Sequence, residues 1–404
     1  MRPLLSALSL LACAGLMAMA WPQDAPTTEP TDEPTRLVDL DAARPMHWRI
    51  SWTEDPARQA TFSWSTAVET ESNRVRLFGE DGVERTVDAV RSAQFTRSGS
   101  DAEDVPDGWY HHARVTDLVP GTRYNFLLES DGAASRPLWF RTAPVGDEPY
   151  ALLYGGDSRS GLVDRQRMNR LIATELAASP DVLAFVHGGD YVYNGKLWAQ
   201  WRDWLDHHEL CTTPDGRVLP VVPTRGNHDG GPLFDEVWDT PGEEGQNWYG
   251  VELPLGLELL TLNTNVSHAG DQLKWLRAEL KERRPRTRWL LCQYHRPASP
   301  AVKAAGAARE AWVPWFEQHD VDLVFESDGH ALKRTAPIRD ESIDETGVVY
   351  LGEGGLGVPQ RVPYSRRWYL QEPGMSGRGH HLTLLEVTAE TLRARTFGYP
   401  VDED

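Results

Sequence analysis

Continuous apolar runs, each followed by a short polar loop, dominate the chain between residues 150 and 330. Runs of this length without alternation are typical of strands that are buried on both faces. Five such runs lie at 151–154, 182–186, 219–222, 289–292 and 321–325. Helices are predicted at 165–178, 198–207 and 271–282, and further strands at 348–351 and 381–387. The pattern therefore predicts an α/β region that begins near residue 147.

Residues 37–146 differ in character, because apolar and polar side chains alternate there over short stretches. The alternation is clearest at 48–52 and 60–64, and a turn at 117–122 leads into a predicted strand at 124–128. Short strands at about ten-residue spacing are typical of a β-sandwich. A chain of 404 residues is long enough for two such domains.

The first residues of the chain have the features of a secretory signal. Arg2 supplies the positive end, residues 4–19 the apolar core, and Ala18-Met19-Ala20 a cleavage site. Residues 21–36 are rich in Pro, Thr and acid and are predicted to be a linker. We therefore expect an exported protein, periplasmic or extracellular, with residues 1–20 as signal peptide and without a membrane span.

The net charge limits the possible binding partners, and the cysteine content bears on disulfide formation. The formal net charge of −19 argues against nucleic acid or an anionic membrane surface, since both require basic patches. It does not exclude an anionic substrate, because a metal centre can supply a local positive field. Beyond the signal only Cys211 and Cys292 remain. Free thiols are favoured for them, and a disulfide stays open.

Each of the five continuous apolar runs is followed by residues that can bind metal ions. The candidates in chain order are Asp157, Asp190, Tyr193, Asn227, His295, Asp328 and His330. A pair of cations needs one shared carboxylate and terminal O and N ligands. Such ions lower the pKa of bound water, so that a hydroxide can attack a phosphate, and they neutralise charge on that phosphate. The order of the loops therefore predicts a two-metal phosphoesterase with its ligands at the carboxyl ends of strands.

Further motifs make the chain similar to a known family. Tyr193 completes G-D-x-x-Y, Trp198 and Trp201 form W-x-x-W, residues 272–276 read Q-x-x-W-L, and residues 352–355 form a late glycine turn. With these motifs the chain resembles the purple acid phosphatases of the metallophosphoesterase superfamily, over roughly residues 45–400. The L-x-P-G-T-x-Y pattern at 118–124 resembles a fibronectin type III module.

The resemblance implies a fold, domains and two metals. The fold is α/β, with two mixed sheets packed face to face and flanked by helices at 147–404, preceded by a sandwich at 37–146. Fe(III) would be bound by Asp157, Asp190, Tyr193 and His330, although Tyr193 could also be a core residue. A divalent ion (Mn, Zn or Fe) would be bound by Asp190, Asn227, His295 and one more ligand. His228 would face the substrate without binding metal.

The chain departs from the family at Ser327-Asp328-Gly329-His330, where the family has G-H-x-H. One register places His330 at the first histidine and leaves Leu332 at the second. The other places Asp328 first and His330 second, and it also matches Ala331, Arg334 and Thr335. We prefer the second register, in which a carboxylate replaces a neutral imidazole and favours harder cations.

Two further positions bear on the substrate. Arg159 follows the first ligand by two residues and could hold phosphate or form a surface salt bridge. The family's additional substrate-facing histidines have no counterpart in residues 298–308, which contain none. The source of a proton for the leaving group is therefore open.

The expected function is an exported hydrolase that cleaves phosphate monoesters of a phosphorylated small molecule. Asp190 would bridge the metals, a metal-bound hydroxide would attack phosphorus, and His228 would assist charge and leaving group. One alternative is a phosphodiesterase of the same fold. The other is a non-catalytic envelope binding protein with a decayed metal site. Asp328 and the absence of the additional histidines support this alternative.

Overall fold

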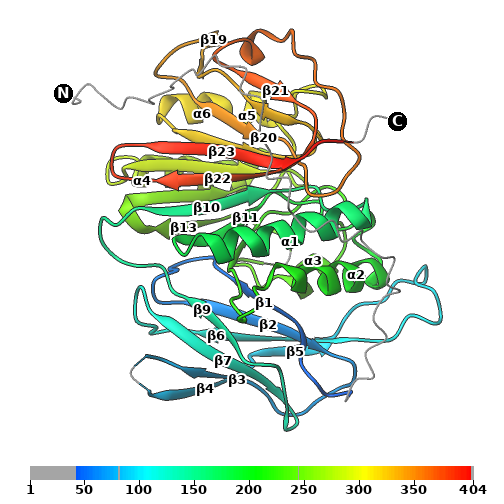
Figure 1. Ribbon diagram of the computed structural model, residues 1–404. Helices are drawn as coiled ribbons and strands as arrows, with labels where there is room; N and C mark the ends of the chain where they lie inside the picture. Colours follow the sequence, from blue (N-terminus) through cyan, green and yellow to red (C-terminus); the bar gives the residue numbers. More distant parts are fainter. Residues whose placement is uncertain (1–41, 81, 244, 402–404) are drawn as a thin grey trace, which may run out of the picture.

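The computed structural model describes residues 42–401 apart from positions 81 and 244. The predicted signal peptide at 1–20 and the linker at 21–36 lie outside the described residues. In Figure 1 an all-β part lies at the bottom and a mixed α/β part is stacked above it. None of the helices described here has the length and apolar character needed to cross a bilayer.

A nine-stranded sheet runs through both parts of the molecule. Its order is β23-β22-β10-β11-β12-β1-β2-β6-β5. The two parts join where β1 pairs in parallel with β12, with Ser51 opposite Val221. The strands are β1 (Met46–Ser51), β2 (Ala60–Thr66), β5 (Arg91–Gln94), β6 (Trp109–Val115), β10 (Tyr150–Gly155), β11 (Val182–His187), β12 (Val221–Pro223), β22 (His380–Val387) and β23 (Leu392–Tyr399).

A seven-stranded mixed sheet forms the second layer of the α/β part. Its order is β13-β14-β15-β16-β20-β17-β21, with β14, β15, β16 and β20 parallel. The strands are β13 (Tyr249–Leu253), β14 (Leu257–Thr261), β15 (Trp289–Tyr294), β16 (Leu323–Glu326), β17 (Leu332–Arg334), β20 (Val349–Gly352) and β21 (Met375–Gly377). A short hairpin of β18 (Ile338–Arg339) and β19 (Ser342–Ile343) lies beside it.

The two sheets pack face to face, as alternating side chains show. Leu152 and Tyr154 of β10 share one core cluster with Leu259 of β14 and Leu291 of β15. The intervening Leu153 belongs to a second cluster together with helix residues. Both faces of these strands are therefore buried, which explains why their sequences are continuously apolar.

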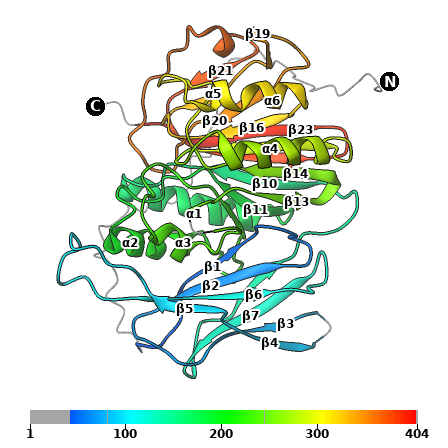
Figure 2. The same ribbon diagram turned by 180° about the vertical axis from the view of Figure 1, so that it is seen from behind.

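Helices cover the outer faces of both sheets, and Figures 1 and 2 show them on opposite sides. Along the nine-stranded sheet lie α1 (Leu162–Ala178), α2 (Trp198–His208) and the short α3 (Leu233–Val237). Along the seven-stranded sheet lie α4 (Gly270–Arg283), α5 (Ala308–Ala311) and α6 (Val313–Gln318). The fold class predicted from the sequence is thus confirmed, and the three predicted helices end within a few residues of the observed ones.

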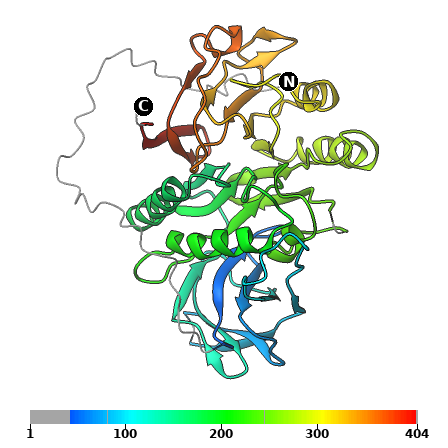
Figure 3. The same ribbon diagram turned by 90° about the vertical axis from the view of Figure 1, so that its right-hand side faces the viewer.

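The all-β part is a sandwich, seen at the bottom of Figure 3. The N-terminal strands of the nine-stranded sheet face a smaller sheet that is built around β7. Tyr124 packs in the shared core, and its hydroxyl accepts a hydrogen bond of 2.9 Å from the backbone N–H of Val119. That hydrogen bond explains why the motif L-x-P-G-T-x-Y at residues 118–124 ends in a tyrosine. The smaller sheet contains β3 (Asn73–Phe78), β4 (Glu84–Asp88), β7 (Arg123–Ser130), β8 (Ala133–Ala134) and β9 (Leu138–Arg141).

Both cysteines beyond the predicted signal are free and buried. Cys211 packs in the cluster outside the nine-stranded sheet and Cys292 in the cluster outside the seven-stranded sheet. Two sheets therefore lie between them, and the open alternative of a disulfide is not realised.

Candidate metal centre

The predicted ligands lie on loops that leave the carboxyl ends of five parallel strands. Asp157 follows β10, Asp190 follows β11 and Asn227 follows β12, whereas His295 follows β15 and the pair Asp328 and His330 follows β16. Because the two sheets are packed face to face, these ends meet at one edge of the double layer.

The backbone at several of these positions is unusual. Asp157, Asp190, Asp328 and His330 have φ values of 60°, 58°, 67° and 59°. Non-glycine residues seldom adopt this left-handed conformation, and it persists where surrounding contacts impose it. The conformation turns the chain sharply after each strand and directs the side chains to a common point.

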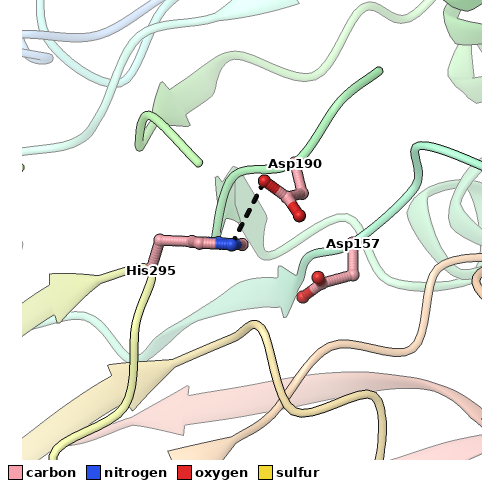
Figure 4. Close-up of side chains that lie close together, drawn as sticks. All are labelled: Asp157, Asp190 and His295. Carbon is pink, nitrogen blue, oxygen red and sulfur yellow. Dashed lines mark ion pairs between the residues drawn. The ribbon is translucent and has the colours of Figure 1, made fainter. Parts of the chain in front are cut away.

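Asp157, Asp190 and His295 lie at the centre of the group (Figure 4). One ligand atom of each lies within 4.8 Å of the others, and all three residues are fully buried. His295 Nε2 lies 3.2 Å from Asp190 Oδ1. His295 Nδ1 lies 2.8 Å from the carbonyl oxygen of Gly188, and a carbonyl only accepts, so Nδ1 carries the proton. In the neutral imidazole the lone pair of Nε2 is then directed at the centre, the arrangement of a metal-binding imidazole.

Charge is concentrated at this centre. Burial opposes a charge on His295, but the carboxylates around it, Asp190 foremost, raise the pKa of its imidazole to about 10. Burial likewise opposes ionisation of Asp190, yet the charge of His295 holds the pKa of this carboxyl below its usual range. A metal cation between them would supply the same compensation with the imidazole neutral.

Several buried polar atoms at the centre take part in no hydrogen bond, which bears on whether these residues could bind a metal ion. Asp157 Oδ1, Asn227 Oδ1 and His295 Nε2 are buried and take part in no hydrogen bond within the described residues. Buried polar atoms are nearly always paired, and an exception is expected where the atom binds a metal ion. Three such atoms, all of ligand type and all at the same strand ends, fit a metal centre.

The remaining candidate ligands, His330 and Asp328, lie close to different members of the central group. His330 Nε2 lies 3.3 Å from Asp157 Oδ1. Asp328 Oδ1 lies 3.7 Å from His295 Nε2. His330 is thus grouped with Asp157, and Asp328 with His295, with Asp190 near both groups.

Arg159, Tyr193 and His228 stand together beside the carboxylates. Arg159 Nε donates to Asp190 Oδ2 at 3.2 Å, and its guanidinium lies 5.3 Å from the centre of the Tyr193 ring. His228 Nδ1 lies 2.6 Å from the carbonyl oxygen of Tyr193, and the two rings are 5.1 Å apart. Tyr193 is 59% exposed, and in the described part of the chain no hydrogen bond joins its hydroxyl to another predicted ligand. The structure therefore brings five of the seven predicted ligands together: Asp157, Asp190, His295, Asp328 and His330. The loop of Asn227 packs against Asp190 through the neighbouring Gly226 and His228, and Tyr193 lies at the margin of the group.

Asp229 is a residue for which the sequence suggested no role. Its fully buried carboxylate accepts hydrogen bonds from the backbone N–H groups of Asp190, Tyr191, Val192 and Gly226 at 2.8–3.4 Å. Burial, and next the charge of Asp190, raise the pKa of Asp229 to about 7. Asp229 thereby joins the loops that carry Asp190 and Asn227. Its place two residues after Asn227 was the only signal in the sequence.

Two glycines are required by close approach to the carboxylates. A Cβ at Gly226 would lie 2.3 Å from Asp190 Oδ1, and one at Gly354 would lie 2.0 Å from Asp157 Oδ2. The glycine turn after β20 therefore packs directly against the first predicted ligand.

Comparisons with known proteins agree with this geometry. Residues 160–332 match the family described as calcineurin-like phosphoesterase, and residues 45–142 match the N-terminal domain of purple acid phosphatase. An uncharacterized protein of Mycobacterium tuberculosis is 26% identical over 313 residues, which cover 66% of this chain and 56% of that protein. The chain thus spans little more than half of that relative.

A plant relative and a solved structure are also similar. The Fe(3+)-Zn(2+) purple acid phosphatase 12 of Arabidopsis thaliana is 23% identical over 379 residues, 82% of this chain and 76% of the relative. The structure of a purple acid phosphatase from yellow lupin seeds has a TM-score of 0.75 at 15% identity, over 87% of this chain and 72% of the lupin chain. At this identity the likeness shows a shared fold.

Proposed function

Because the chain is a purple acid phosphatase-like member of the calcineurin-like phosphoesterases, we propose that it hydrolyses phosphate monoesters at a centre of two metal ions. The observation that carries the proposal is the convergence of the buried ligand atoms of Asp157, Asp190 and His295, which lie within 4.8 Å of one another. Metal ions held there would activate a water molecule and neutralise charge on a bound phosphate.

The ligands divide into two sets in this proposal. Asp157, Asp190, Tyr193 and His330 hold one ion, and Asp190, Asn227, His295 and Asp328 hold the other. The separations of His330 from Asp157 and of Asp328 from His295 support this register. By analogy with the Arabidopsis relative, the first ion is Fe(III) and the second a divalent ion, for which Asp328 favours Mn over Zn.

His228 and Arg159 act on the substrate. The Nδ1–H of His228 is held by the Tyr193 carbonyl, which leaves Nε2 free to exchange a proton with the substrate. The side chain of Arg159 is only 11% exposed, and the guanidinium presents several N–H groups beside Asp190 and His330. It is suited to hold phosphate oxygens.

The proposal includes export, on the basis of the signal-like residues 1–20. Sequencing the N-terminus of the protein from the cell envelope or medium should find a mature chain that begins after Ala20. Intact residues 1–20 on a cytoplasmic protein would contradict export but would not bear on the proposed hydrolase activity.

Turnover of p-nitrophenyl phosphate and of its bis-ester, with and without a chelator, tests the activity. We expect faster turnover of the monoester, loss of turnover with chelator and recovery on adding metal. Asp190→Asn should lower kcat by at least roughly 10³-fold. The control is Asp239→Asn, which alters a carboxylate that pairs with Arg91 and Arg114 in the link to the sandwich. Absence of turnover in the metal-loaded protein would favour a binding function.

A further inference from the structure

A tightly anchored loop carries the one lysine that reaches the candidate centre in the described residues. The loop spans residues 296–306 between β15 and α5. Beneath it lie three fully buried charged side chains, Glu326, Lys333 and Glu353. Glu326 accepts the N–H of Ala298 at 2.6 Å, and Glu353 accepts the N–H of Ala301 at 2.6 Å. Buried charge-assisted hydrogen bonds of this kind fix a backbone firmly.

The outer side of the loop is held as well. Arg367 donates to the carbonyl oxygen of Lys303 at 2.7 Å, and Tyr369 donates to that of Pro300 at 2.8 Å. The backbone of Lys303 is therefore fixed on both sides, and its side chain projects from a defined point.

The ammonium group of Lys303 contacts Asp328 Oδ1. The Lys303 side chain is 38% exposed, whereas that of Asp328 is 9% exposed. The lysine thus approaches the carboxylate from the solvent side, while His295 Nε2 approaches the same oxygen from the interior at 3.7 Å. Lys303 is therefore the solvent-accessible partner of this ion pair.

The contact between Lys303 and Asp328 changes the charge balance of the candidate centre. Asp328 adds one negative charge to a position where the resembling family has a neutral histidine, which weakens the attraction of the centre for an anion. Lys303 restores one positive charge at the same place. A second cationic group, the guanidinium of Arg159, lies beside Asp190.

We propose that Lys303 is a substrate-binding residue, which together with Arg159 selects phosphate groups that carry two negative charges. The inference rests on the proposed hydrolase function and names the residues through which the site would prefer phosphate monoesters to diesters. A diester phosphate carries a single charge and has two of its oxygens esterified. It therefore gains less from a second cation and offers fewer free oxygens for hydrogen bonds.

The test measures phosphate binding separately from turnover. The Kd of inorganic phosphate for the metal-loaded protein is determined by calorimetry for wild type, Lys303→Gln and Lys303→Arg. Loss of a charge-assisted hydrogen bond should raise Kd about tenfold in Lys303→Gln, and Lys303→Arg should restore most of it. KM for the monoester should rise by a similar factor, with a much smaller rise for the bis-ester and little change in kcat.

The control is Lys274→Gln, which removes an exposed lysine that pairs with Asp271 on α4, away from the centre. It should change neither Kd nor KM. Equal Kd values for wild type and Lys303→Gln would overturn the inference, and so would an equal rise of KM for both esters. Loss of metal from Lys303→Gln would assign Lys303 a purely structural role and also overturn it. If wild type binds phosphate through Lys303 but hydrolyses neither ester, the proposed function fails while Lys303 remains an anion-binding residue.

Discussion

Asp229 offers a way to disturb the centre without touching a metal or substrate. The two oxygens of its carboxylate accept four backbone N–H groups, from the loop after β11 and from Gly226 in the loop after β12. Asp229→Asn keeps the shape of the side chain but replaces one oxygen by an NH₂ group. At best two of the four N–H groups then retain an acceptor, and the other two face a donor.

The size of the effect follows from these bonds. A buried N–H that loses its acceptor costs roughly 1–3 kcal/mol. Two such losses predict a decrease of about 2–6 kcal/mol in the free energy of unfolding. With an unfolding entropy of about 2.1 cal/mol/K per residue, Tm should fall by roughly 3–8 °C in a protein of this size. Because Asp190 and Asn227 are displaced together, the metal affinity should fall by roughly 10–100-fold, as for other groups that orient ligands.

The assay is thermal unfolding of the metal-free protein, followed by equilibrium dialysis against the metal. Asp239→Asn is the matched control, because its buried carboxylate also accepts several hydrogen bonds, from Arg91 and Arg114, but lies away from the ligands. It should lower Tm and leave metal affinity unchanged. If Asp229→Asn lowers Tm as Asp239→Asn does while binding metal with wild-type affinity, Asp229 does not position the ligands. An unchanged Tm would refute the hydrogen-bond argument itself.

Three further predictions concern residues in and beside the candidate metal centre. His228→Ala should lower kcat by roughly 10²-fold with metal content unchanged, as expected for a lost proton donor; loss of metal in this variant would make His228 a ligand. Tyr193→Phe should remove a phenolate-to-iron absorption band from the oxidised protein while its circular dichroism stays the same; an iron-loaded wild type without colour would exclude Tyr193 as a ligand of Fe(III). Asp328→Ala should deplete only the divalent ion, Asp328→His should restore binding with a shift toward Zn, and His330→Ala should deplete the other ion. Retention of both metals in Asp328→Ala, measured by elemental analysis, would favour the other register.

Long elements with a single period were predictable from the sequence. The helix predicted at 271–282 is observed at Gly270–Arg283, and the strand predicted at 182–186 is observed at Val182–His187. Short elements such as α3 and α6 were missed, because five or six residues do not establish a helical period. The pairing of β1 with β12 was missed for another reason, since it joins segments about 170 residues apart that carry no local signal of each other.

The ligand loops could be identified because each candidate ligand follows a strongly apolar strand within a few residues. Lys303 could not, since it lies in a loop without a period and its contact with Asp328 depends on backbone hydrogen bonds to Glu353 and Arg367. Tyr193 shows the opposite case. Its motif suggested a ligand, whereas its side chain lies at the margin of the group, so its role stays a prediction.

The charge of the chain and the charge of the centre act at different distances. The formal net charge of −19 repels an anionic substrate in general. At physiological ionic strength, however, this repulsion is screened over about 8 Å. Within that distance of the carboxylates lie Arg159 and Lys303, which contact Asp190 and Asp328. Local cations can therefore determine phosphate affinity in a strongly acidic protein, and long-range steering should contribute little to its association rate.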